Sequence, residues 1–77
     1  MRPAGEVVRA AQGLAICRAD DRSHPEIGAQ LVDADLEPAG TVVDVFGPVE
    51  RPYLALSPGS GSRAASLIGS RLYVRTE

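Results

Sequence analysis

A cysteine and a histidine are the first side chains in this chain that could do chemistry. Cys17 and His24 are the only residues of their types among the 77. A thiol nucleophile needs a base beside it and a third group that orients the base. Cys17 falls in an apolar run and His24 in a polar stretch, and nothing in their spacing brings them together. We therefore expect Cys17 to fill a strand face, His24 to lie in a loop, and no residue to be catalytic.

Two further patterns could bind a metal ion or a phosphate. Asp20 and Asp21 are adjacent in a polar stretch, but loops that hold hard cations supply several oxygens at fixed spacing around a glycine turn. The Gly-Ser run 59–62 is followed by Arg63 and lacks the Lys-Ser/Thr pair of a phosphate-binding loop. We expect no metal site, no cofactor and no enzymatic activity.

The segment from Asp44 to Tyr53, DVFGPVERPY, is the strongest candidate for a binding site. It contains two of the six prolines, one of the two tyrosines and the single phenylalanine. Proline has a fixed φ and no amide hydrogen, so a rigid corner between two strands is expected. Aromatic side chains of a small barrel can pack in its core, but they are also enriched at protein interfaces. For Phe46 both interpretations stay open, while for Pro48, Val49 and Tyr53 we favour an interface.

Composition limits the class of protein. Ten acidic residues outnumber eight basic ones, all arginine, and give a net charge of −2, which is unfavourable for a free-standing nucleic-acid binder. A single cysteine rules out a disulfide within the chain. No apolar run approaches the ~20 residues that span a membrane, and the N-terminus lacks the apolar stretch of a secretory signal. We expect one domain over residues 1–77 in a cytoplasmic protein without membrane contact.

The elements that must position these residues are short strands. Apolar and β-branched runs punctuated by Gly and Pro predict six of them: 5–10, 13–18, 28–33, 40–46, 52–57 and 68–75. Gln12-Gly13 predicts a tight hairpin turn, and the segment 57–66 a flexible loop. Alternation in 40–46 places Asp44 on the same face as Val42 and Phe46, where its carboxylate would bond amides of the next turn or help fix the corner. This pattern is typical of a small closed β-barrel, in which closure removes exposed edges.

Three segments of the chain together resemble a known family. GEVVRAAQGLAICR, PEIGAQLVDADLEPAGTVVDVFGPVERPYLALSP and LIGSRLYVR are similar in order and spacing to the archaeal Gar-one protein family, subunits of H/ACA ribonucleoproteins. The resemblance runs from about Gly5 to Arg75. Its most specific part is the run from Gly40 to Val49 followed by Pro52-Tyr53. Eukaryotic relatives carry Gly/Arg-rich tails, and the lack of such tails here favours an archaeal minimal form.

The resemblance implies a six-stranded β-barrel that docks on the catalytic domain of a dyskerin-like pseudouridine synthase. Such a subunit is non-catalytic, contacts the guide RNA only indirectly, and promotes loading and turnover of substrate RNA, rRNA included, by controlling a mobile loop of the synthase. Carried onto this chain, the partner-binding residues are Phe46, Gly47, Pro48, Val49, Pro52 and Tyr53.

Two other functions stay open. The alternation in 68–75 points Leu72 and Val74 inward, and an RNA-binding surface could use the outward arginine and tyrosine side chains. Its candidate residues are Arg63, Arg71, Tyr73 and Arg75. A barrel of the translation-factor type, acting on ribosomes, is the second alternative.

Overall fold

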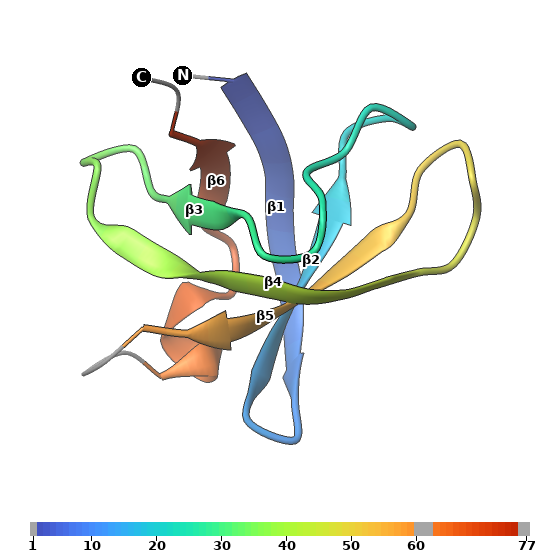
Figure 1. Ribbon diagram of the computed structural model, residues 1–77. Coiled ribbons are helices and arrows are strands. Elements are labelled where there is room, and N and C mark those ends of the chain that lie inside the picture. The colour runs from blue at the N-terminus through green and yellow to red at the C-terminus, as the bar shows by residue number, and fades with distance from the viewer. Residues whose placement is uncertain (1, 60–62, 76–77) are drawn as a thin grey trace.

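Six antiparallel strands and one short helix form the structure, a computed structural model that describes residues 2–59 and 63–75. The strands are β1 (Arg2–Ala11), β2 (Leu14–Ala19), β3 (Gln30–Val32), β4 (Pro38–Phe46), β5 (Tyr53–Pro58) and β6 (Arg71–Val74). They close a barrel in the order β1-β2-β5-β4-β3-β6 (Figure 1). The predicted closed six-stranded β-barrel is confirmed.

The hairpin that joins β1 to β2 has the predicted turn. Ala11 pairs with Leu14, so the loop contains only Gln12 and Gly13, which adopt φ values of 53° and 80°. Positive φ at both central residues is the conformation that matches the twist of a two-residue hairpin. The turn therefore fixes the register of the first two strands.

The segment before β6 differs from the prediction. A 3-10 helix, η1 (Ala64–Leu67), precedes a turn at Ile68-Gly69, so the strand expected from residue 68 begins only at Arg71. Gly69, at the end of the turn, has a positive φ of 88°. Ala64, the first residue of η1, packs into the core. Within the expected loop 57–66, Ser57 and Pro58 belong to β5, and residues 60–62 lie outside the described part of the chain. The flexibility of this loop stays a prediction.

The barrel interior is apolar. Its largest fully buried side chains come from all six strands, and no polar or charged residue is buried among those described. They are Leu31, Leu54, Leu56, Leu72, Val7, Val42 and Cys17. In β6, Leu72 and Val74 pack toward this core, as the alternation predicted.

A β-bulge changes the expected alternation in β4. Val42 pairs with Leu56 and Asp44 with Ala55, so Val43 is an extra residue opposite β5. Val42 is buried and Val45 packs against the core, whereas Val43 and Asp44 are exposed. The predicted common face of Val42 and Asp44 is wrong, because the inserted residue reverses the alternation. Asp44 needs no buried partner, and its Oδ1 accepts a hydrogen bond from the Val45 amide at 2.8 Å.

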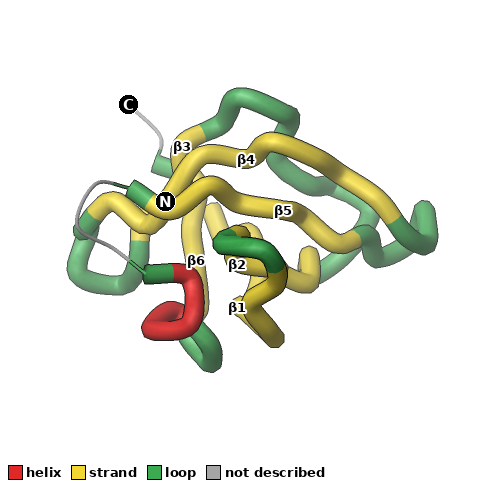
Figure 2. Tube along the Cα trace, turned by 90° about the horizontal axis from the view of Figure 1, so that it is seen from below, coloured by secondary structure: helices red, strands yellow, loops and turns green. Residues whose placement is uncertain are grey.

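Two strands approach closely at Gly40, near the start of β4. A Cβ atom at this position would lie 2.5 Å from the Ser57 carbonyl oxygen on β5. From there β4 and β5 run side by side to their connecting loop, which lies at the right-hand edge of both views (Figures 1 and 2). That loop is the predicted corner.

Candidate protein-binding surface

The corner is the loop 47–52 together with the two aromatic residues that flank it. Phe46 ends β4, Tyr53 begins β5, and the two residues pair across the strands. Their rings stack with centroids 5.6 Å apart and an interplanar angle of 21°. Offset stacking of this kind stabilises a pair by about 0.5–1.5 kcal/mol beyond the area it buries. The aromatic pair therefore holds the base of the corner closed.

Gly47 turns the chain directly beneath the Tyr53 ring. Its φ is 91°, and a Cβ atom there would lie 2.9 Å from Cδ2 of Tyr53. Glycine is thus required for both its conformation and its lack of a side chain. The corner depends on this residue to bring the ring against the backbone.

Exposure differs among the six predicted partner-binding residues. Val49 is 74% exposed and Phe46 39%, and Pro48 is also exposed. Tyr53 is half-buried and Pro52 is buried. The structure therefore brings all six together at one corner, where Phe46, Pro48 and Val49 present apolar surface and the other three shape it.

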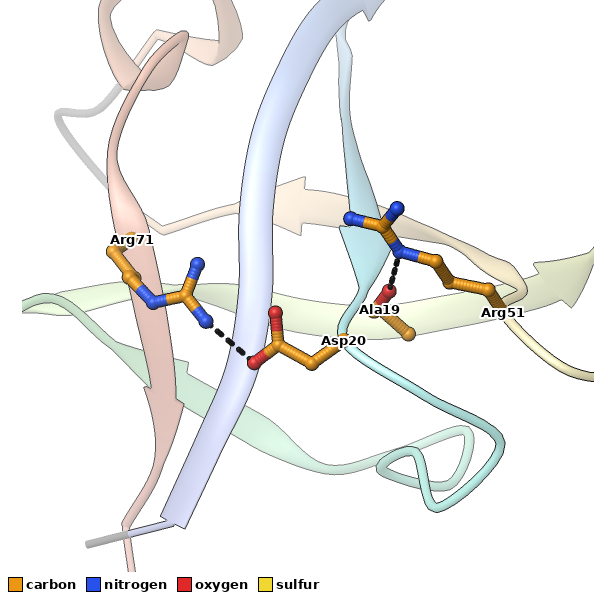
Figure 3. Close-up of polar contacts among 4 residues, drawn as sticks. All are labelled: Ala19, Asp20, Arg51 and Arg71. Atoms are coloured by element: carbon orange, nitrogen blue, oxygen red, sulfur yellow. Dashed lines mark hydrogen bonds and ion pairs between the residues drawn. The ribbon is translucent and has the colours of Figure 1, made fainter.

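Hydrogen bonds tie the corner to the end of β2. The Ala19 amide donates to the Pro52 carbonyl at 2.9 Å, and Arg51 Nε donates to the Ala19 carbonyl at 3.0 Å (Figure 3). Within the loop, the Arg51 amide donates to the Pro48 carbonyl at 3.3 Å. A loop bonded in this way loses little conformational entropy when a partner binds.

Arg18 is a residue of this surface that the sequence reasoning missed. It lies on β2 opposite Tyr53, with its guanidinium carbon 4.9 Å from the centre of the tyrosine ring. Its Nη1 donates to the Tyr53 hydroxyl at 3.1 Å. The strands β2 and β5 are far apart in the sequence, and only their pairing in the barrel places this arginine beside the corner. No local pattern around residue 18 carries that information.

A groove separates the corner from the loop that follows β2. It has a volume of about 310 Å³ and is lined by Arg22 and His24 on one side and by residues of the corner on the other. His24 Nδ1 lies 2.8 Å from the Pro25 carbonyl oxygen. The sequence predicted that His24 lies in a loop but not that this loop lies beside the corner. A larger hollow of about 420 Å³, at the β3 side of the barrel, includes Arg75 and none of the predicted partner-binding residues.

The candidate RNA-contact residues do not form one cluster. Arg71 and Tyr73 share the outer side of β6, and Arg75 follows the strand, whereas Arg63 precedes η1. Arg71 also donates to Asp20 in an ion pair of 2.6 Å (Figure 3). This hydrogen bond raises the pKa of Arg71. Its guanidinium is therefore already occupied by a carboxylate of the same chain.

The groups that could do chemistry are kept apart. Cys17 has no exposed surface in the barrel wall, and burial, followed by the nearby Asp20 charge, raises the pKa of its thiol to about 12. His24 lies in the loop after β2. Among residues 2–59 and 63–75, no three His, Cys, Asp or Glu side chains gather in a way that could hold a metal ion. Over the same residues, no helix is long and apolar enough to cross a membrane.

A small closed barrel with its thiol sealed inside and a rigid apolar corner outside defines a binding module. The family comparison agrees with this class. Residues 1–77 match the Gar1/Naf1 RNA binding region, and the chain belongs to this family. No curated protein matches the chain. Members of the family are non-catalytic subunits of H/ACA ribonucleoproteins, which confirms the resemblance and the expectation that the chain is not an enzyme.

Proposed function

We propose that this subunit binds the pseudouridine synthase of an H/ACA complex through the corner and promotes loading and turnover of substrate RNA, including rRNA. The observation that carries the proposal is the exposure of Phe46 and Val49 at a corner that hydrogen bonds tie to the end of β2. Apolar and aromatic side chains at the centre of an interface supply most of its binding free energy. The family match supports an H/ACA complex in which a synthase is the catalytic subunit.

The proposed mechanism is a shift between two states of the synthase. A non-catalytic subunit can change turnover only by binding one state of a mobile synthase loop more tightly than the other. The corner suits this role because its stacked rings and hydrogen bonds keep one shape. Contact with the guide RNA would then be indirect, and the complex would act in the cytoplasm.

Substitutions in the corner test the proposal. Val49→Ser removes apolar surface from an exposed side chain, so folding should be unaffected. We expect its Kd for the synthase of the same host, measured by calorimetry, to rise roughly 5- to 30-fold, since an interface anchor contributes about 1–2 kcal/mol. Phe46→Ala should weaken binding as well. Any binding of the free subunit to guide RNA should not change.

The control for this experiment is Val8→Ser. Val8 is the extra residue of the β1 bulge and is 44% exposed, but it lies outside the corner. Its replacement should leave the Kd within about twofold of the wild type. Normal co-purification of a folded Phe46→Ala/Val49→Ser double variant with the synthase would refute the proposal.

Direct RNA binding is a second candidate function. The family is described as an RNA binding region, and Arg71, Tyr73 and Arg75 follow one another along the outer side and end of β6. A gel shift with guide RNA alone, at moderate salt, distinguishes the two functions. Tight, salt-sensitive binding of guide RNA without the synthase would favour direct RNA binding. Loss of that binding in a Tyr73→Ala variant would show that the outer side of β6 is the RNA-binding surface.

A further inference from the structure

Arg18 is held in place by contacts with Tyr53 instead of by an ion pair. Its guanidinium lies over the Tyr53 ring and donates one hydrogen bond to the Tyr53 hydroxyl. Its Nε is buried without a hydrogen-bond partner in the described part of the chain. Arginine carries five N–H donors in a fixed fork, so most of the hydrogen-bonding capacity of Arg18 is unused.

No carboxylate among the described residues lies within ion-pair distance of this arginine. Glu6 lies opposite Arg18 on β1, yet the one ion pair in residues 2–59 and 63–75 joins Arg71 to Asp20. Arg51, the other arginine near the corner, donates to a backbone carbonyl. A half-buried charge without a counter-charge is costly, and a carboxylate supplied by a partner would offset that cost.

The neighbours of Arg18 indicate what kind of partner fits. The fork adjoins the Phe46–Tyr53 stack, and Phe46 lines the groove that also contains the exposed Val49. An acidic side chain flanked by apolar ones would fill both parts of this surface. A nucleic-acid backbone would bring phosphates against the apolar part and against the carboxylates of Asp44 and Glu50 in the same segment.

We infer that Arg18 binds an Asp or Glu side chain of the partner protein while the corner binds apolar residues next to it. The inference rests on the proposed function, which it deepens by giving the chemistry of the contact. The terminal guanidinium nitrogens donate to the carboxylate oxygens, the geometry that makes arginine effective at interfaces. The Tyr53 ring and hydroxyl hold the guanidinium in place before the partner binds, so forming the ion pair costs little further side-chain entropy.

Calorimetry of the full chain with the synthase tests the inference. Arg18→Gln should raise Kd at least tenfold and make it less sensitive to salt between 50 and 300 mM. Arg18→Lys keeps the charge but lacks the fork, and should have an intermediate Kd. Arg9→Gln makes the same change in net charge at an exposed position on β1, and should stay within twofold of the wild type. If Arg18→Gln does not fold, Arg18→Lys alone should still raise Kd at least threefold.

A partner-side experiment separates ion pairing from a structural role of Arg18. Asp and Glu residues of the synthase that cross-link near the corner are changed singly to Asn or Gln and combined with Arg18→Gln. One of them should show coupling of at least fivefold in Kd. Additive effects for all of them would overturn the inference, as would an effect of Arg18→Gln that appears only with guide RNA present. If Arg18→Gln is silent while Val49→Ser weakens binding, only this inference fails. If the folded Phe46→Ala/Val49→Ser double variant binds the synthase normally, the proposed function fails.

Discussion

At the scale of single residues, Tyr53 connects three strands on the outside of the barrel. Its ring stacks on Phe46 of β4, lies under the Arg18 guanidinium of β2, and covers Gly47. Its half-buried position suits a residue that supports the exposed Phe46 and Val49. Replacing Tyr53 should therefore weaken partner binding through the loss of the arrangement as much as through the loss of direct contact.

Cys17 provides a prediction on stability against pH. The pKa of its thiol is raised from 9.0 to about 12 in the folded chain, first of all by burial. Below pH 9 the thiol is protonated in both states and has no effect on the pH dependence. Above pH 9 the unfolded chain loses the proton and the folded chain retains it, so the free energy of unfolding falls as pH rises, by up to about 1.4 kcal/mol per pH unit.

Urea denaturation of the wild type and a Cys17→Ala variant between pH 7.5 and 10.5 measures this effect. The variant has no thiol, so the wild type should lose about 2 kcal/mol more than the variant by pH 10.5. The difference isolates Cys17 from tyrosines and other groups that titrate in the same range. Parallel curves for the two proteins would show that the thiol ionises equally well in the folded state.

At the scale of strands, the close contact between β4 and β5 at Gly40 leads to a prediction about stability. In Gly40→Ala the new methyl group would lie 2.5 Å from the Ser57 carbonyl oxygen, a backbone atom, and neither atom can move without a shift of its strand. We expect a loss of about 1–3 kcal/mol in the free energy of unfolding, because the two strands must separate. Gly59→Ala is the matched control, since its nearest atom would be the Pro38 carbonyl oxygen at 4.0 Å. Equal stabilities of the two variants in urea denaturation would contradict this explanation.

Local patterns predicted most of the strands but not their irregularities. The Gln12-Gly13 turn and the inward side of β6 followed from residue type and alternation. The bulge at Val43 could not be predicted, because Val42 and Val43 are identical and only the register with β5 decides which is extra. Helix η1 was not predicted because its four residues are too few to show helical periodicity.

The sequence predicted only that part of the binding surface whose residues are neighbours in the chain. The corner is one continuous segment, so its prolines and aromatic residues could be recognised together. Arg18 and Arg22 are distant from it in the sequence and join it only through the pairing of β2 with β5 and the course of the loop after β2. Which residues line the groove is therefore a property of the closed barrel.

At the scale of the whole molecule, the barrel has a short seam. β3 and β6 contain three and four residues, and they pair only at Leu31 with Val74 and Val32 with Tyr73. By contrast, β1 pairs with β2 from Gly5 to Ala11. Because each strand pair contributes to the free energy of opening, the barrel should open first between β3 and β6.

Native-state hydrogen exchange followed by NMR checks this order. Amides of β3 and β6 should exchange by partial openings with a lower free energy than the bonded amides of β2 and β5. The core amides should require global unfolding, so their exchange should respond to urea with the full denaturant slope. Exchange of β3 and β6 amides at the global free energy would show that the seam opens only with the rest of the barrel.

The position of the two chain ends has a mechanical consequence. Arg2 pairs with Val74 in the antiparallel β1–β6 pair, so the chain enters and leaves the barrel at the same end of one strand pair (Figure 1). A force pulling the ends apart would load the hydrogen bonds of this pair one after another, as in opening a zip, instead of shearing them all at once. The barrel should therefore yield to low tension applied through its ends, while the corner, which joins β4 to β5 and belongs to neither loaded strand, lies outside the line of force.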